Sequence, residues 1–405
     1  MSLPELTASR LYCTAALCAL SSWAAHAQIT PLGDPPVPQA LADQPLVWRA
    51  GLQWQRDDNV LRSSQAPLAD RIGVASVGVR LDQTYGRQRV ELDAQLEGYR
   101  YDRASQLDFN ALNYLAAWNW GLGPQWSGRL SLQRRQFVDR FGQTTADSGL
   151  IRRIESSESA QAGYRLGAGW QALAGLYARR QDQNDPAEPD LALKGAELGL
   201  RYSLPSDSKL AYWFRQGRGE YSGAAWPAGA GDFDETEHAL ELVGLLSDRL
   251  RINGQMAYLQ REHQQLSERD FSGLVARVGL NWALSAKTSL GAGLVRELAA
   301  YQSSDASYFE GYRGFVAPQW QASPKTSLRL RFEGGQRQYK GAPAGAPVGV
   351  PSRRDTLQMA SLELQWQALR QLSLSATVQR DERRSNQPGA QYRARIVALS
   401  AQAGF

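Results

Sequence analysis

Arginine is the side chain with the greatest capacity for chemistry in this sequence, and it recurs at alternate positions. Of the 45 basic residues only five are lysines, which leaves 40 arginines. The planar guanidinium group of arginine pairs with carboxylates and donates hydrogen bonds to sugar hydroxyls. In LRLRFEG at 328–334, for example, Arg329, Arg331 and Glu333 alternate with apolar residues.

This alternation predicts a hydrophilic face that lines a water-filled interior. We expect the lining to include Arg80, Arg89, Glu91, Asp93, Arg129, Arg201, Arg215, Arg329, Arg331, Glu333 and Glu363. A wall that mixes arginine with acidic residues has little net charge. Such a wall suits the passage of a sugar polymer better than the strong selection of ions. The alternative is that these residues pair with one another across strands and only stiffen the wall. The net charge of +5 favours either acidic solutes or contacts with lipopolysaccharide phosphates.

Residues for catalysis, metal binding or nucleic-acid binding are sparse. Beyond residue 27 the histidines are His238 and His263, and no H-E-x-x-H, G-x-S-x-G or metal-spaced cluster occurs. The carboxylate-rich stretches 181–190 and 231–235 do not have the ligand spacing of a calcium loop. No basic run indicates nucleic-acid binding. We therefore predict no catalytic residue, no metal and no cofactor, while a hydrolase that uses a pair of carboxylates stays open.

Residues 1–27 have the features of a secretory signal peptide. An apolar run follows Arg10, and Ala25-His26-Ala27 forms a small-x-small cleavage site. The run is too short to span a bilayer as a helix. Both cysteines, Cys13 and Cys18, lie inside this segment, so we expect the exported chain to hold no disulfide. The Pro-rich stretch at 28–45 is expected to be a disordered lead-in.

The rest of the chain has the two-residue period of β-strands. In LSLSATVQ at 372–379, Leu374, Ala376 and Val378 fall on one face and polar residues fall on the other. The same alternation occurs at 90–97 and 328–334. Several strands reach roughly 10–15 residues, which is long for a soluble sheet and suits a tilted crossing of a bilayer.

Short and long connections alternate strictly between these strands. The short turns lie at 85–86, 123–124, 167–168, 205–207, 247–249, 285–287, 323–325 and 369–370. Eight turns and nine longer loops predict about eighteen strands, or sixteen if the weakly alternating segments 46–55 and 151–166 are not strands. Short periplasmic turns and longer extracellular loops are typical of bacterial outer-membrane barrels. We therefore predict an all-β, antiparallel transmembrane β-barrel over 46–405, closed because hydrocarbon cannot satisfy a free strand edge.

Aromatic residues near the strand ends predict two girdles at the membrane interfaces. The tryptophans near the short turns or the N-terminal entry are Trp48, Trp120, Trp126, Trp170, Trp282, Trp320 and Trp366. The tyrosines beside the long loops are Tyr99, Tyr101, Tyr177, Tyr221, Tyr301, Tyr308 and Tyr339. Aromatic residues favour strands in any case, but strand propensity alone does not predict this separation by strand end.

Several segments together resemble a known family. They are ALNYLAAWNWGLGPQWSGRLSLQRRQ at 111–136, GAELGLRYSLPSDSKLAYWFRQGRGEY at 195–221, FDETEHALELVG at 233–244, PQWQASPKTSLRLRFEGGQRQY at 318–339 and RRSNQPGAQYRARIVALSAQAGF at 383–405. In these turn and girdle patterns the chain is similar to the EpsL-type outer-membrane proteins found with exopolysaccharide biosynthesis operons, within the β-barrel porin families. The resemblance implies an outer-membrane barrel of an exopolysaccharide synthesis and export system, without catalytic residues.

The segment ALSAQAGF at 398–405 is expected to be a last strand that ends on Phe405. Its alternation places Phe405, Ala403 and Leu399 toward lipid and Gln402 toward the interior. We expect its free edge to pair with the first strand near Trp48. The resemblance to bacterial outer-membrane barrels implies that Phe405 is the assembly signal that the barrel-assembly machinery recognises.

These observations together predict a porin-like protein of the bacterial outer membrane that passes an exopolysaccharide, or assists its passage, through a hydrophilic lumen. A general diffusion porin for small hydrophilic solutes is the first alternative. The second is a barrel plugged by its own loops that acts as a structural or docking component of a secretion complex. The expected partners are outer-membrane lipid and lipopolysaccharide, the barrel-assembly machinery, polysaccharide and export-system components, and no nucleic acid.

Overall fold

The structure is a computed structural model that describes residues 44–139, 151–184, 189–206, 208–223, 231–300, 306–341 and 352–405. The expected signal peptide at 1–27 lies outside these ranges, as does the expected lead-in at 28–45 except for its last two residues.

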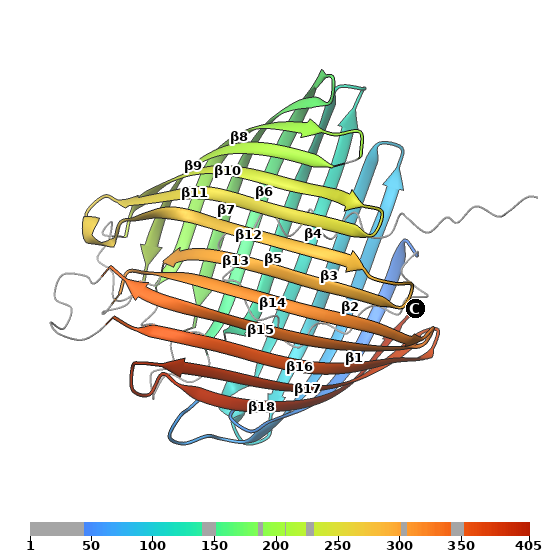
Figure 1. Ribbon diagram of the computed structural model, residues 1–405, viewed down its shortest axis with the longest axis vertical. Helices are drawn as coiled ribbons and strands as arrows, with labels where there is room; N and C mark the ends of the chain where they lie inside the picture. Colours follow the sequence, from blue (N-terminus) through green and yellow to red (C-terminus); the bar gives the residue numbers. More distant parts are fainter. Residues whose placement is uncertain are drawn as a thin grey trace, which may run out of the picture.

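Eighteen antiparallel strands of the described chain form a closed barrel (Figure 1). Each strand pairs with its neighbours in sequence, and the last pairs with the first. The strands are β1 (Leu46–Asp57), β2 (Asp70–Tyr85), β3 (Gln88–Tyr101), β4 (Phe109–Leu122), β5 (Trp126–Asp139), β6 (Ile151–Gly167), β7 (Trp170–Gln183), β8 (Asp190–Ser203), β9 (Lys209–Ser222), β10 (Phe233–Ser247), β11 (Leu250–His263), β12 (Phe271–Ala283), β13 (Thr288–Ala300), β14 (Tyr308–Ser323), β15 (Thr326–Lys340), β16 (Arg354–Leu369), β17 (Leu372–Ser385) and β18 (Tyr392–Gly404). The predicted fold and the larger of the two predicted strand numbers are confirmed.

Two sets of connections give the barrel two different ends. Turns of two to five residues join strands at one end, here called the turn end, and longer connections join them at the other, the loop end. Gly86 and Gly123 begin two of the turns with φ values of +59° and +60°, a region that glycine adopts without strain. Two short 3₁₀ helices, η2 (Ser105–Leu107) and η3 (Ser267–Arg269), lie in connections at the loop end. No helix among the described residues is long and apolar enough to cross a membrane.

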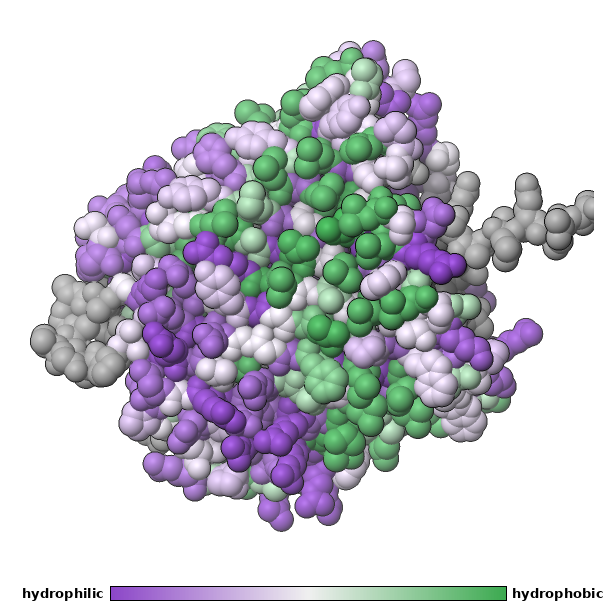
Figure 2. Space-filling model, viewed as in Figure 1, coloured by the Kyte–Doolittle hydropathy of each residue, from purple (hydrophilic) through white to green (hydrophobic). Residues whose placement is uncertain are grey.

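The two-residue period decides which side chains face outward. In β17, Val378 is 55% exposed on the outer face, whereas its neighbour Gln379 is 4% exposed on the inner face. Residues paired across neighbouring strands share a face, so this alternation continues around the barrel. Figure 2 shows the result on one side of the molecule: apolar residues gather over the middle and the turn end, and the loop end is mainly hydrophilic.

Strand β6 forms although the outward residues in the middle of the strand are polar. Ser156 and Glu158 face outward, yet β6 pairs with β5 in unbroken register from Tyr164 to Ile151. It also pairs with β7 along most of its length. Backbone hydrogen bonds to both neighbours therefore stabilise a strand whose side-chain pattern is weak.

Pairing of β18 with β1 closes the barrel, as the sequence predicts. The Trp48 N–H donates to the Phe405 carbonyl at 2.8 Å, and the Phe405 N–H donates to the Trp48 carbonyl at 3.0 Å. The register then continues to Asp57 opposite Ile396. The Phe405 ring is exposed on the outer face, and its recognition by the barrel-assembly machinery stays a prediction.

Candidate functional site

The interior of the barrel is filled at the loop end and is more open at the turn end of some strands. Inward-facing side chains near the loop end, such as Tyr101, Phe233 and Asp355, are buried. Near the turn end, inward-facing side chains of β5 and β9 such as Arg129 and Lys209 remain partly or fully exposed, whereas Val47 on β1 and Gln402 on β18 are buried. A solute inside the barrel therefore finds room at the turn end beside strands such as β5 and β9.

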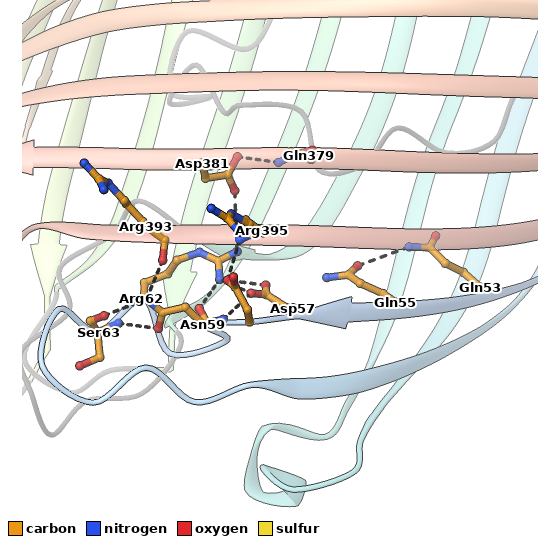
Figure 3. A network of polar contacts seen from close by, with 11 residues as sticks. Gln53, Gln55, Asp57, Asn59, Arg62, Ser63, Gln379, Asp381, Arg393 and Arg395 are labelled. Atoms are coloured by element: carbon orange, nitrogen blue, oxygen red, sulfur yellow. Dashed lines mark hydrogen bonds and ion pairs between the residues drawn. The ribbon is translucent and has the colours of Figure 1, made fainter.

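A network around Arg62 shows how the loop half is filled (Figure 3). Arg62 lies in the connection between β1 and β2, and its Nη1 is 2.8 Å from the Asp57 carboxylate. Its Nη2 is 3.8 Å from Asp381 of β17. Burial opposes the charge of Arg62, but the Asp57 carboxylate beside it raises its pKa above the usual range. Asn59 adds a hydrogen bond of 2.8 Å to the Arg393 carbonyl, so this connection is fastened to the seam of the barrel.

The turn half contains a chamber of about 430 Å³ on the inner wall of β2 to β10. The inward-facing residues that line it include Arg89, Asn119, Arg129, Ser157, Gln161, Gln171, Arg179, Glu197, Arg201, Lys209, Arg215 and Glu241. Seven basic residues and three carboxylates contribute to the lining in all. One of the three, Glu158, pairs with the outward-facing Leu132 and therefore points away from the interior. Positive charge is thus in excess inside the chamber.

Arg215 on β9 is the most strongly bound of these arginines. Its Nε, Nη1 and Nη2 lie 2.9, 2.6 and 3.0 Å from carboxylate oxygens of Glu197, Glu237 and Glu241, respectively. The guanidinium also lies over the Trp213 ring, 5.2 Å from its centroid. The three carboxylates come from β8 and β10, the strands that flank β9, so the node ties three strands together.

Three other basic residues on the strands of the chamber have no ion pair within the described residues. Arg201 donates from Nη1 to the amide oxygen of Gln171 at 3.4 Å, and Arg179 lies over the Tyr177 ring at 5.1 Å. Lys209 is exposed at the turn end. Because their charges are not neutralised by a bound carboxylate, these residues can attract an anion.

The predicted lining residues fall into three groups. Arg89, Arg129, Arg201 and Arg215 line the chamber. Inward-facing positions next to it hold Arg80, Glu91 and Asp93 on β2 and β3. The other four lie on β15 and β16, outside the chamber: Arg329, Arg331, Glu333 and Glu363.

Pairing across or along strands, the alternative to solute contact, accounts for most of these residues. Arg89 lies 2.6 Å from Asp82, and Arg129 lies 3.4 Å from Glu91. On the other wall, Arg331 lies 2.8 Å from Glu333, and Arg329 lies 3.7 Å from Glu363. Asp93 is bound by Arg49 of β1, whose side chain reaches across β2. It crosses at Gly78, where an added Cβ atom would lie 3.4 Å from the guanidinium.

Arg179 and Lys209 line the chamber but are not among the lining residues predicted from the sequence. The inward positions of β7 include Leu173 and Tyr177, so its inner face does not look polar and Arg179 is not conspicuous. A signal was nevertheless present. Trp170 is expected to face outward, and Arg179 is an odd number of positions from it along β7. Residues separated by an odd number of positions lie on opposite faces of a strand, so Arg179 faces inward.

The predicted tyrosine girdle at the loop end is wrong. Tyr101, Tyr177, Tyr221 and Tyr339 are buried inside the barrel, and Tyr99 stacks on the inward-facing Phe109 at 4.4 Å. Three of them pack against interior arginines, which lie 4.6–5.8 Å from the ring centroids. Tyr308 is only partly buried, and Tyr301 lies outside the described residues. The alternation of the strands turns these tyrosines inward, and cation–π contacts with arginine stabilise them there.

The tryptophans near the turn end lie on the outer face. Side chains with large exposed areas are those of Trp48, Trp126, Trp170, Trp282, Trp320 and Trp366. Trp120 covers Gly128, where a Cβ atom would lie 2.3 Å from its ring, and is less exposed. Their role as an interfacial girdle stays a prediction.

The two histidines do not form part of an evident reaction site. His238 is on the outer face, where its Nδ1 hydrogen-bonds to the Tyr212 hydroxyl at 2.8 Å. His263, which the sequence places at a loop, is buried at the end of β11 with its Nδ1 3.2 Å from Asp270. Within the described ranges, no group of three or more His, Cys, Asp or Glu side chains is arranged to hold a metal ion.

Replacing Arg215 with methionine should destabilise the barrel strongly. The variant would leave three carboxylates close together without their cation, and breaking a buried ion pair costs roughly 3–5 kcal/mol. Urea unfolding of the barrel refolded in lipid vesicles would measure the loss. Arg218→Met is the matched control, because Arg218 is 74% exposed on the outer face and its one ion pair within the described residues is with Asp234. Equal midpoints for the two variants would show that the node does not stabilise the fold.

Part of the chain matches a known family model. Residues 242–405 match the model of the family described as "Putative beta-barrel porin 2". This match covers β11 to β18 and the end of β10. No curated protein matches the chain in sequence.

Solved structures of outer-membrane porins have a similar fold. The outer membrane protein OpdK from Pseudomonas aeruginosa is 10% identical with a TM-score of 0.50. The improved structure of the P. aeruginosa protein OccK1 (OpdK) is 11% identical with a TM-score of 0.50. In both cases the similarity covers 89% of this chain and 99% of the other. The chain has the fold of outer-membrane porins.

Proposed function

We propose that this protein is an outer-membrane porin that admits small hydrophilic solutes and prefers anions. The observation that carries the proposal is the chamber of about 430 Å³ in which basic residues outnumber carboxylates. Arg179, Arg201 and Lys209 supply charge that no ion pair of the described residues neutralises. A wall of one charge sign raises the local concentration of solutes with the opposite charge.

The volume of the chamber and the filled loop half favour small solutes over a polymer. The chamber volume is in the range of pockets that hold small molecules. The loop half is filled by buried side chains such as Arg62, Asp355 and Arg383, whose ion pairs would have to separate before a wide polymer could pass. The small-solute alternative from the sequence therefore fits these observations better than its main prediction of polymer export.

Reconstitution into planar bilayers tests the proposal directly. Under a KCl gradient we expect stable open channels with a reversal potential that indicates chloride preference. In liposome-swelling assays, a small carboxylate should enter faster than a neutral sugar or an amine of similar size. Channels that prefer cations, or an absence of channel openings, would contradict the proposal. The latter result would favour the docking role of a plugged barrel.

Passage of an exopolysaccharide is the second candidate, and it rests on the sequence resemblance to EpsL-type proteins. On this proposal polysaccharide and export-system components would be partners. A deletion strain separates the two functions: export predicts loss of surface polysaccharide, whereas a porin predicts slower uptake of small anions with surface polysaccharide unchanged.

A further inference from the structure

A hollow of about 770 Å³ lies on the outer wall of the barrel across β12 to β17. Its floor contains Gly314 and Gly334, which are paired in register on β14 and β15. A Cβ atom at Gly334 would meet only the Leu357 carbonyl oxygen, at 3.9 Å, so the space above this glycine is open. Leu294 and Phe332, both exposed, form apolar sides. The hollow is therefore shaped and lined to accept a hydrocarbon chain from outside the barrel.

A cluster of arginines borders this hollow on the side toward the loop end. Glu382 is 6% exposed, and Arg380, Arg384 and Arg393 lie 3.0, 2.8 and 3.2 Å from its carboxylate oxygens. The three guanidinium-bearing side chains are 54%, 65% and 69% exposed. One carboxylate thus holds three arginines in place and neutralises only one of their charges.

A fourth arginine increases the charge excess. Arg395 on β18 is directly opposite Arg380 on β17, and like charges in opposite positions destabilise a sheet. No carboxylate side chain within the described residues forms an ion pair with Arg395. The exposed apolar residues Val378 and Val397 lie two positions from this pair, so the arginines stand at the edge of the apolar band. Arginine on the lipid-facing wall is tolerated at an interface but not deep in hydrocarbon.

We propose that this wall binds one acylated lipid whose headgroup carries phosphate groups. A phosphate contacts Arg380, Arg393 and Arg395, and an acyl chain occupies the hollow above Gly314 and Gly334. Guanidinium groups bind phosphate through paired, charge-assisted hydrogen bonds, and the phosphate relieves the repulsion between the two opposed arginines. A soluble anion would satisfy the arginines but not the apolar hollow, which is why the occupant is a lipid. The proposal rests on the outer-membrane placement given above, where lipopolysaccharide supplies this chemistry.

Native mass spectrometry of the refolded barrel tests the headgroup site. The probes are the phosphorylated lipid anchor of lipopolysaccharide, the same lipid without phosphate, and phosphatidylethanolamine. We expect the wild-type barrel to retain one molecule of the phosphorylated lipid and little of the other two. The triple variant R380Q/R393Q/R395Q should bind it at least about tenfold more weakly. Arg384 still pairs with Glu382 in this variant, so the carboxylate is not left without a partner.

Gly334→Leu tests the hollow separately, because its side chain would fill the open space without a backbone clash. We expect it to weaken lipid retention while the headgroup arginines are intact. Arg218→Gln, on another part of the outer face, should retain the lipid as the wild type does. Anion conductance of all variants should be unchanged, so loss of the lipid site and failure of the porin proposal are distinguishable. Equal retention by the triple variant, or of the lipid without phosphate by the wild type, would overturn the proposal.

Discussion

Replacing both Arg179 and Arg201 with glutamate is expected to turn an anion-preferring channel into a cation-preferring one. The two arginines lie on adjacent strands of the chamber and have no ion pair within the described residues, so the substitutions leave no carboxylate without a partner. A unit charge at contact distance in water contributes about 1 kcal/mol, and 1.4 kcal/mol is a factor of about ten. Two reversals should therefore change the anion-to-cation permeability ratio by at least about tenfold. The reversal potential in a KCl gradient measures this change.

The control for this experiment is Arg218→Glu, which changes the same kind of charge on the outer face. It should leave the reversal potential at the wild-type value. High salt should reduce the difference between wild type and double variant, because exposed charges are screened over about 10 Å at 0.1 M ionic strength. If the double variant kept its chloride preference at low salt, the chamber would not be the selective part of the path.

A proline at Ala401 is expected to prevent assembly of the barrel. Ala401 is paired with Leu52 of β1 and with Leu374 of β17, so its backbone lies between two strands. Proline removes a ladder hydrogen bond and clashes with its neighbours, at a cost of about 3 kcal/mol or more. In hydrocarbon the freed carbonyl and the opened strand edge would find no water. The yield of heat-modifiable barrel in the outer-membrane fraction measures the effect.

Ala286→Pro is a matched control for the proline itself. Ala286 lies between Ser285 and Lys287 in a turn, and the turn at Ser323-Pro324-Lys325 already contains proline at the same place. In both turns the lysine N–H donates to the serine hydroxyl oxygen at 3.2 Å. Ala286→Pro should therefore assemble normally. Wild-type yield of the Ala401→Pro variant would show that the seam is not needed for closure.

Side-chain periodicity and connection length were the features of this fold that the sequence made visible. Alternate residues of a strand face opposite sides, so LSLSATVQ at 372–379 predicted that Val378 and Gln379 lie on opposite faces, as they do. The burial of Gln379 in the filled interior was not predicted. Eight short turns and nine longer connections predicted about eighteen strands, or sixteen if 46–55 and 151–166 were not strands, and the structure has eighteen. These are local properties, which depend on residues close together in the chain.

The partners of individual arginines could not be predicted in this way. Arg215 is bound by carboxylates 18, 22 and 26 residues away, and Arg201 has no ion pair among the described residues although the same alternation places both inward. The tyrosines near the loops, by contrast, follow the alternation. Tyr221 is an even number of positions from the inward Arg215, and cation–π contacts with arginine stabilise it inside.

The sequence by itself therefore determined that this chain forms a closed barrel with a hydrophilic inner face and an apolar outer face, since both follow from the period of two and the strand count. Only the tertiary structure decided that the loop half is filled, that the turn half holds a chamber with excess positive charge, and that Arg380 stands opposite Arg395 on the outer wall. Each of these depends on the register between strands, which sets distances between residues far apart in the chain. Register is fixed by the pairing of all eighteen strands together and cannot be found from any one of them.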